Sequence, residues 1–288
     1  MSKNSPIIGI FLMILASALL SSKDGIVKTI VDEVDPFLIL WIQFLGTYVL
    51  IALVSLPKHG WNVVRVSSPG LQFIRGALNV GAVMCFFNAL KYIPLADATA
   101  MLLFAPVVAT LLSPFVLGEK IGVLRITAAV VGFCGVLTIL RPGFAGDPTG
   151  YYFGLSAGLL LGGYFISNRR LAGTQHYLLN ITHNALMGTV ALTPFMFIYW
   201  DPIPDAVYLK LVIIVVLGIL GQSFMISSFK FAPAGVISPY SYTMLIFAAT
   251  IGYFVFGTVP DAVSWLGMGL IVGSGLYIAH RERRLSGG

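Results

Sequence analysis

The stretch ALKYIPLADATAMLLFAPVVATLLSPFVLGEK, Ala89–Lys120, returns in altered form as SFKFAPAGVISPYSYTMLIFAATIGYFVFGTV, Ser228–Val259. The two copies are 139 positions apart and align without a gap, with Lys91 on Lys230, Pro94 on Pro233 and Gly118 on Gly257. Both copies are almost wholly apolar. Self-similarity at a fixed spacing is typical of a chain built from related units, here two halves.

The composition predicts a membrane protein. Of the 288 residues, 58% are hydrophobic and only 10% are charged. Hydrophobic runs of about 18 to 23 residues recur along the chain, each long enough to cross a bilayer core of roughly 30 Å as a helix. The alternating polarity of β-barrel strands is absent. We therefore expect an all-α polytopic fold with ten transmembrane helices, the first of them a retained helix, near residues 7–26, 36–56, 71–92, 95–117, 122–140, 150–169, 177–199, 208–229, 234–257 and 262–280.

The distribution of charge predicts the orientation. If the N-terminus is cytoplasmic, 12 of the 17 basic residues fall in cytoplasmic segments and nine of the 11 acidic residues fall outside. The positive-inside rule therefore places both termini in the cytoplasm, in a cytoplasmic (inner) membrane. The net charge of +6 is explained by this orientation and not by a nucleic-acid partner.

The repeat is predicted to be inverted, because five spans, an odd number, separate equivalent positions. Weaker matches agree, pairing Gly9 with Gly150, Ala16 with Ala157 and Gln43 with His183. The expected units are residues 7–142 and 148–281, followed by a cytoplasmic tail, 282–288. Inverted repeats are common in secondary transporters, whose substrate site lies near the bilayer midplane between the halves. Duplication of a merely stable bundle is the alternative.

The residues also resemble a known family over nearly the whole length, the EamA-type transporters of the drug/metabolite transporter superfamily. The resemblance rests on Lys28, Arg75-Gly76, Ala89–Ala98, Gly118–Lys120 and Ile139–Gly143. It implies two five-helix repeats and a central cavity lined by the first, third, fourth, sixth, eighth and ninth helices. Many members have an arginine where this chain has Gln43, which places an anion site built on that arginine in question.

Polar residues on the cavity helices are the candidate substrate-binding residues, because an intramembrane polar group is costly unless it pairs or faces water. They are Asn79, Asn88, Tyr164, Gln222, Ser223, Tyr240 and Thr243. Hydrogen bonding between helices, or anchoring of the tyrosines at the membrane interface, is the alternative explanation. Tyr240 is preferred over Tyr242 because residues two apart on a helix point roughly 200° apart.

A second group has possible coupling or gating roles: Lys23, Gln43, Glu119 and His183. Asp24 and Lys28 are expected to form an i,i+4 ion pair at the end of the first span. Asp24, Asp97 and Glu119 all lie near span ends, so no mid-membrane carboxylate is available as a proton carrier. His183 could change charge near neutral pH, although a packing role is the more ordinary one.

Several features are expected to be structural. Pro106 and Pro114 are expected to kink the fourth span. Small residues four apart, at Gly154, Gly158 and Gly162 and at Gly269 and Gly273, permit close helix contact, within the fold or, for the last span, between subunits. Cys85 and Cys134 are expected to be buried free thiols, with no cofactor and no metal site.

The sequence thus predicts a secondary transporter that moves a small organic metabolite by alternating access, as a monomer or homodimer in the lipid bilayer. A zwitterionic, cationic or ring-bearing solute is preferred: an amino-acid derivative, amine, nucleoside-like cofactor or vitamin. A carboxylate carrier is the alternative within transport. A membrane-embedded transferase is the rival from another class, but no His, Asp or Cys constellation supports it. A non-transporting scaffold is the third possibility.

Overall fold

The structure, a computed structural model, describes residues 6–60, 69–118, 122–140, 148–171, 177–231 and 234–286. Every regular element in these ranges is helical. Prolines mark several helix starts, because proline lacks the N–H that the first turn leaves unpaired. The helices are α1 (Pro6–Lys28), α2 (Pro36–His59), α3 (Pro69–Tyr92), α4 (Leu95–Leu102), α5 (Ala105–Leu117), α6 (Val123–Leu140), α7 (Thr149–Leu171), α8 (Tyr177–Tyr199), α9 (Asp205–Ser228), α10 (Ala234–Ile237), the 3₁₀ helix η2 (Ser238–Tyr242), α11 (Thr243–Phe256) and α12 (Ala262–Ser286).

Length and composition confirm a polytopic α-helical membrane protein. Within the described part of the chain, seven segments are long and apolar enough to cross a bilayer. Two shorter apolar helices, Ile126–Leu140 and Ala262–Ile278, lie in α6 and α12. The seven do not include α7, whose 23 residues run from Thr149 to Leu171. Glycines and tyrosines are interspersed among its apolar residues and lower its mean hydropathy below that of the other segments.

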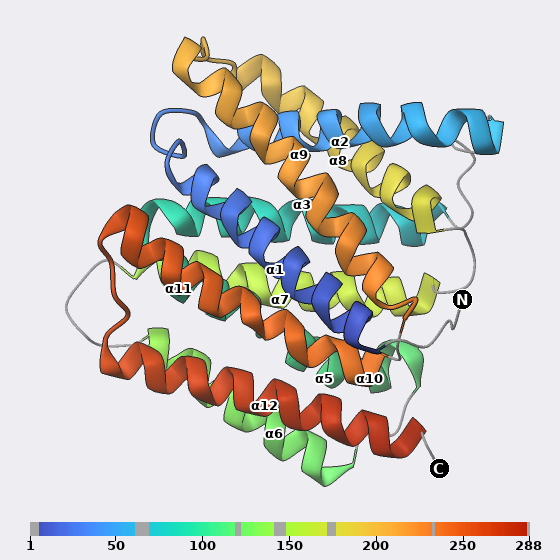
Figure 1. Ribbon diagram of the computed structural model, residues 1–288, viewed down its shortest axis with the longest axis vertical. Coiled ribbons are helices and arrows are strands. Elements are labelled where there is room, and N and C mark those ends of the chain that lie inside the picture. The colour runs from blue at the N-terminus through green and yellow to red at the C-terminus, as the bar shows by residue number, and fades with distance from the viewer. Residues whose placement is uncertain are drawn as a thin grey trace.

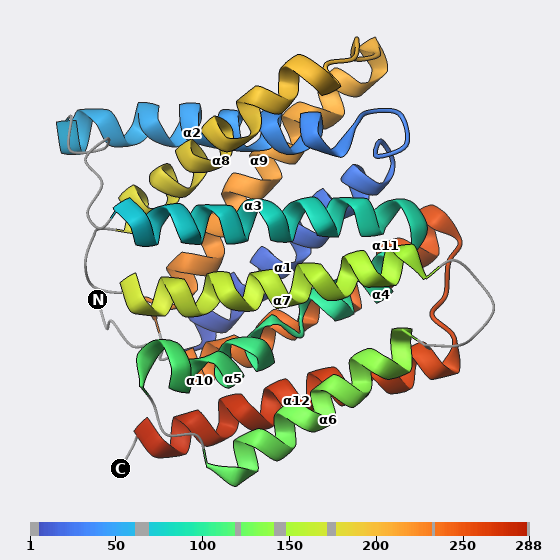
Figure 2. The same ribbon diagram turned by 180° about the vertical axis from the view of Figure 1, so that it is seen from behind.

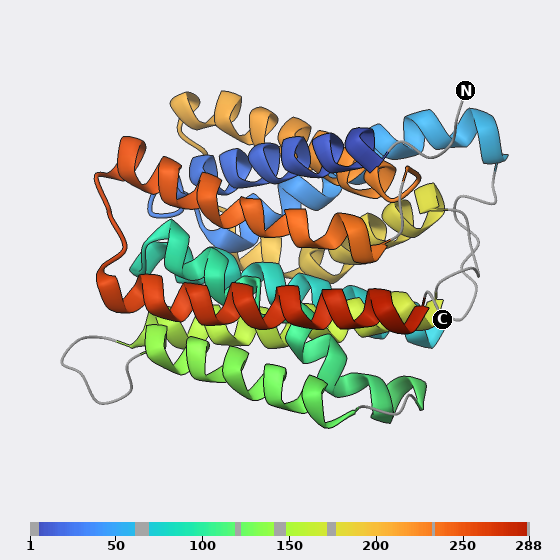
Figure 3. The same ribbon diagram turned by 60° about the horizontal axis from the view of Figure 1, so that its bottom comes forward.

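The helices form two layers that are closed at both edges. In Figure 1, α9, α1 and α11 run side by side in front of α3 and α7, and Figure 2 shows α3, α7 and α4–α5 from behind. We call α9, α1 and α11 the first layer, and α3, α7 and α4–α5 the second layer. At one edge α2 packs on α8, and at the other α12 packs on α6, which Figure 3 brings forward.

The surface between the two layers is the layer interface. Across it, α1 contacts α3 and α4, and α11 contacts α4. Figure 1 also shows that α1 begins and α12 ends at the same end of the bundle. The layer interface therefore extends along the helix axes, and residues near the start of α1 and the end of α12 lie at the same end of it.

Two membrane segments are broken at equivalent positions. The segment of α4 and α5 is interrupted at Leu103 and Phe104, just before Pro106. With the 139-residue spacing of the repeat, this break corresponds to Tyr242 and Thr243, where η2 gives way to α11. The kink expected at Pro106 takes the form of this break between α4 and α5, whereas Pro114 lies inside α5 without interrupting it.

The ends of the same two segments also match. Gly118 closes α5 with φ of 70°, and Gly257 closes α11 with φ of 64°. This left-handed conformation costs a residue with a Cβ roughly 1–2 kcal/mol, and glycine avoids that cost. The same left-handed backbone conformation therefore requires a glycine at both equivalent positions. The sequence alignment of the two copies does not by itself show this conformation.

Close helix packing explains other glycines. A Cβ on Gly158 would overlap the carbonyl oxygen of Met101, so the backbone of α7 at this glycine lies directly against the backbone of α4. Gly154 and Gly162 likewise contact α4 and α5, which confirms the expected contact within the fold. Gly269 and Gly273 differ, because a Cβ on either would have no described atom within 4 Å.

Candidate functional site

Lys23 brings a charge to the layer interface from α1. Its side chain is only 9% exposed, and its ammonium lies 5.3 Å from the ring centroid of Phe87 on α3, in the other layer. The stem of Lys23 passes Gly218 of α9, where a Cβ would lie 3.6 Å from Lys23 Cδ. Three helices from both layers therefore enclose one buried cation.

Asp24 is the neighbour of this cation. Lys23 Nζ lies 2.7 Å from Asp24 Oδ1, and the Asp24 side chain is 3% exposed. Residues i and i+1 diverge by about 100° on a helix and do not face each other. The pair forms only because the lysine side chain is long enough to bend back. Among the described residues, no donor other than Lys23 approaches Asp24 Oδ1.

The expected ion pair between Asp24 and Lys28 is wrong. Lys28 instead crosses to α3 and donates hydrogen bonds to the carbonyl oxygens of Leu90 at 2.6 Å and Ile93 at 2.9 Å. The last carbonyls of a helix have no partner within it and carry partial negative charge, so a lysine satisfies them well. Lys28 also lies 5.6 Å from the ring of Phe256 at the end of α11. It ties both layers together at this end of the bundle.

A second polar cluster lies between α3 and α7. Arg75 is 2% exposed, and its Nη1 donates a hydrogen bond of 3.3 Å to Asn168 Oδ1 of α7. Gln72, one turn earlier on α3, is 1% exposed. Tyr164, one turn before Asn168, lies close enough to Arg75 to interact with it electrostatically. A buried arginine has five donors to satisfy, which explains the surrounding oxygens.

His183 lies near this second cluster. It is fully buried on α8, one turn before Met187, and Met187 packs on the backbone of Gly76 next to Arg75. Residues four apart share a helix face, so His183 belongs to the side of α8 that meets α3. Gln43 of α2 is half-buried, and no described residue donates a hydrogen bond to its Oε1.

The remaining predicted residues of the first repeat are half-buried. Asn88 donates from Nδ2 to the carbonyl oxygen of Met84 in its own helix, at 2.9 Å. Asn79 and Tyr164 flank the contact between Leu78 and Gly163 that joins α3 to α7. Glu119 lies outside the described residues.

In the second repeat the predicted residues are spread over two places. Tyr240 is half-buried and packs with an apolar cluster around Met13 and Ile237, between α1 and α10. Thr243 donates a hydrogen bond of 2.6 Å to the carbonyl oxygen of Tyr240, a local contact. On α9, Gln222 is exposed and Ser223 half-buried. Gln222 stands one turn from Gly218, and so on the side of α9 that faces Lys23.

Tyr242 faces away from the layer interface. Its hydroxyl is packed against Gly275 of α12, with no hydrogen bond from a described residue. Tyr242 thus packs between η2 and α12. This agrees with the expectation that its side chain points in a different direction from that of Tyr240.

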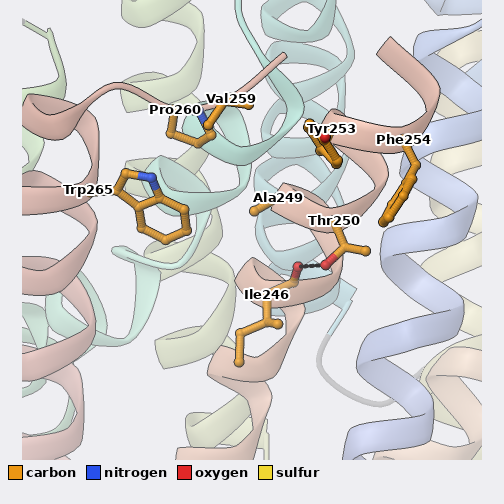
Figure 4. A pocket seen from close by; sticks show the side chains of 8 residues that line it. All are labelled: Ile246, Ala249, Thr250, Tyr253, Phe254, Val259, Pro260 and Trp265. Atoms are coloured by element: carbon orange, nitrogen blue, oxygen red, sulfur yellow. Dashed lines mark hydrogen bonds between the residues drawn. The ribbon is translucent and has the colours of Figure 1, made fainter. Parts of the chain in front are cut away.

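An apolar groove of about 410 Å³ lies between α11 and α12. Figure 4 shows Ile246, Ala249, Thr250 and Tyr253 on α11 facing Trp265 of α12 across it. The one hydrogen bond drawn there stays inside α11, from Thr250 Oγ1 to the carbonyl oxygen of Ile246. The groove has no charged lining residue, so it does not suit a polar solute.

Metal and thiol chemistry find no support in the described ranges. No group of three or more His, Cys, Asp or Glu side chains within them could hold a metal ion. Cys85 is half-buried and Cys134 is exposed on α6. The burial expected for Cys134 is therefore wrong, because that face of α6 points away from the bundle.

Sequence reasoning missed the partnership of Asp24 and Phe87 with Lys23, and the burial of Arg75 between α3 and α7 within the second layer. A signal was present for the first: two adjacent opposite charges, Lys23 and Asp24, sit inside the predicted span 7–26, in its last turn. Phe87 gave none, since an aromatic residue in an apolar helix is ordinary.

The comparisons with known proteins agree with this architecture. Residues 7–141 and 148–279 each match the EamA-like transporter family. An uncharacterized transporter of Helicobacter pylori is 28% identical over 96% of both chains. An S-adenosylmethionine uptake transporter of Rickettsia felis is 27% identical, over 96% of this chain and 93% of that one. The pseudopaline exporter CntI of Pseudomonas aeruginosa is 27% identical, over 92% and 93% of the two chains.

A solved crystal structure shares the fold, with a TM-score of 0.63 and 21% identity over 97% of both chains. Together with the stacked apolar helices, these matches identify the chain as a member of the EamA-like transporter family, a multi-pass membrane transporter of small metabolites and not an enzyme.

Proposed function

We propose that this chain is a secondary carrier that works by alternating access between two inverted repeats, residues 7–142 and 148–281. Ten membrane segments result if α4 and α5 form one segment and α10, η2 and α11 form another. Each repeat then contains five segments. The observation that carries the proposal is the pattern of contacts between helices.

That pattern is nearly unchanged when the two repeats are exchanged. The contact of α1 with α9 has its counterpart in α7 with α3, and α1 with α11 corresponds to α7 with α4 and α5. Likewise α2 with α9 corresponds to α8 with α3. The pairs α2 with α8, α4 with α11 and α6 with α12 each map onto themselves. Such internal symmetry lets a carrier form two equivalent arrangements by rocking one unit against the other.

Single residues support the same exchange. A Cβ on Gly9 would lie 3.3 Å from Phe231 Cβ, and one on Gly150 would lie 2.5 Å from Tyr92 Cβ. Gly9 and Gly150 are equivalent, and so are Tyr92 and Phe231, 139 positions apart. The same helix crossing thus occurs twice, once at each end of the bundle.

The proposed orientation places both termini in the cytoplasm of a cell with an inner membrane. The charge distribution favours it, and α1 begins at the end of the bundle where α12 ends. Lys28 and the ends of α3 and α11 then lie at the outer side, and the α3–α7 cluster around Arg75 lies toward the cytoplasm. The partners of the carrier are the lipid bilayer and its solute, and it acts as a monomer or homodimer.

For the solute we propose an amino-acid derivative, with nucleoside-like compounds included. The relative from Rickettsia felis is named for the uptake of S-adenosylmethionine, which contains both an amino-acid part and a nucleoside part. In this chain, buried charges of both signs and the aromatic ring of Phe87 lie together at the layer interface. A simple dicarboxylate would meet one cation beside a carboxylate, which disfavours it electrostatically.

Flux into liposomes tests the proposal. The purified full-length chain is reconstituted and offered radiolabelled S-adenosylmethionine, methionine, an amine and a dicarboxylate in turn. We expect saturable uptake of S-adenosylmethionine or methionine, accelerated when the same unlabelled solute is preloaded inside. Saturable flux of the dicarboxylate alone would refute the proposed solute class, and the absence of flux for every solute would refute the carrier.

A further inference from the structure

We propose that Lys23 and Asp24 together bind the zwitterionic head group of the solute, with Lys23 Nζ on its α-carboxylate and Asp24 on its α-ammonium. This inference rests on the proposed function and assigns the recognition step to two residues of α1. The head group would insert between the two side chains and replace their mutual ion pair by two new ones. The net charge of the site is zero before and after binding.

Burial is the first argument. Lys23 and Asp24 are 9% and 3% exposed on their side chains, inside a segment that spans the membrane. Removing an ion from water costs several kcal/mol even after the protein relaxes, and a lone contact seldom recovers it. Intramembrane ions that persist despite this cost mark solute pathways. Other buried polar groups of α1 have ordinary roles: Ser21 donates a hydrogen bond of 2.9 Å to the Met244 carbonyl oxygen of α11.

Geometry is the second argument. Adjacent helical residues diverge by about 100°, so the two charged groups approach each other only by the bending of the lysine stem. The 2.7 Å contact joins Lys23 Nζ to Asp24 Oδ1, and no other described residue donates a hydrogen bond to that oxygen. The carboxylate therefore keeps acceptor capacity, and the ammonium, with three donors, keeps donors for a ligand. A head group that carries both a carboxylate and an ammonium offers Lys23 and Asp24 better hydrogen-bond partners than the two side chains offer each other.

Position is the third argument. Lys23 belongs to the first layer, while Phe87, beneath its ammonium, belongs to the second. A ligand held by Lys23 and Asp24 would touch both layers, as a carrier requires for alternating access. Gly218 supplies room, because a Cβ there would meet only Lys23 Cδ, at 3.6 Å, within 4 Å. In the other repeat the position equivalent to Lys23 is Tyr164, so the charged pair occurs once.

Competition by solute analogues tests the inference on the unmodified protein. Uptake of radiolabelled S-adenosylmethionine into liposomes is measured against unlabelled S-adenosylmethionine, its decarboxylated form and 5′-methylthioadenosine, which lacks the whole head group. We expect the inhibition constant of each of the two analogues to be at least about 30-fold higher than that of unlabelled S-adenosylmethionine. A ratio of this size is expected when a buried charge loses its partner. Equal competition by 5′-methylthioadenosine would overturn the inference while leaving the carrier intact. No saturable uptake of S-adenosylmethionine or methionine would overturn the solute class, and this inference with it.

A double variant separates recognition from structural support. Lys23→Met with Asp24→Asn keeps side-chain size and net charge, and removal of a whole buried ion pair is often neutral or stabilising. We expect an unchanged or higher melting temperature, but a half-saturating concentration for S-adenosylmethionine raised at least about 30-fold, without preference over 5′-methylthioadenosine. A lower melting temperature with unchanged selectivity would show a purely structural pair and overturn the inference.

Two leucine substitutions test the position of the site. Gly269→Leu, on α12, adds the side chain where a Cβ would have no described atom within 4 Å, and it should leave the half-saturating concentration within about twofold. Gly218→Leu fills the space next to the Lys23 side chain and should raise the half-saturating concentration tenfold or more, which corresponds to a loss of about 1.4 kcal/mol or more in binding free energy. Equal uptake by both variants would contradict a site at this position.

Discussion

Replacement of Lys28 by methionine should destabilise the fold measurably. The methionine keeps the length of the stem but removes the two hydrogen bonds to Leu90 and Ile93, of 2.6 and 2.9 Å. A hydrogen bond to a charged group contributes about 1.5–3 kcal/mol, and half-burial of Lys28 favours the lower value. Two such bonds give a loss of about 3 kcal/mol in the free energy of unfolding. The cation–π contact with Phe256 adds at most about 0.5–1 kcal/mol.

The assay is the melting of the purified protein in detergent, followed by tryptophan fluorescence. At about 2 °C per kcal/mol for a chain of this size, the loss corresponds to a decrease of about 6 °C. Lys91→Met is the matched control, because Lys91 lies in the last turn of the same helix α3. Its interaction with the helix dipole is worth about 0.3–1 kcal/mol, so its melting temperature should fall by no more than about 2 °C. Equal decreases in the two variants would refute the argument that Lys28 acts through the carbonyls of α3.

Three further outcomes follow from the described contacts. Gly257→Ala should lower the free energy of unfolding, measured by chemical denaturation, by about 1–2 kcal/mol, because φ of 64° strains any residue with a Cβ. Gly269→Ala is the control: it has open space and an ordinary helical backbone, and it should not lower that free energy. Gly158→Ala should cost about 1–3 kcal/mol and reduce the yield of monodisperse protein, since its Cβ would overlap the Met101 carbonyl oxygen of α4. Trp41→Phe removes the 3.1 Å hydrogen bond to Thr193, and thermal melts should report a loss near 0.6 kcal/mol.

The membrane segments could be predicted from the sequence because hydropathy and helix signals agree there. The expected span at 36–56 is α2, Pro36–His59, and that at 71–92 is α3, Pro69–Tyr92. The break before Pro106 followed from the chemistry of proline. Its counterpart took a different form, a 3₁₀ helix that includes Pro239.

The site could be predicted only in part, because its contacts join residues distant in the sequence. Helical spacing suggested that Lys28 would pair with Asp24, but Lys28 reaches α3 instead, 62 residues away. The long lysine stem makes either partner accessible, and only the packing of α1 against the second layer decides between them. By contrast, Lys23 was identified from its charge alone, since a charge inside a span needs an explanation wherever its partners lie. Whether Asn79, Gln222 or Tyr240 touch the solute stays a prediction.

The replacement of Lys23 by Tyr164 in the second repeat has a consequence for kinetics. If the two repeats were identical, the outward-open and inward-open forms would have equal free energy and the carrier would bind its solute equally well from both sides. A charged pair in one repeat and a phenol in the other remove that equality, so half-saturation should differ between the two faces of the membrane. The difference cannot change the final accumulation, which the gradients alone determine. The difference makes one orientation of the empty carrier more populated than the other, so that the solute binds mainly from one face of the membrane.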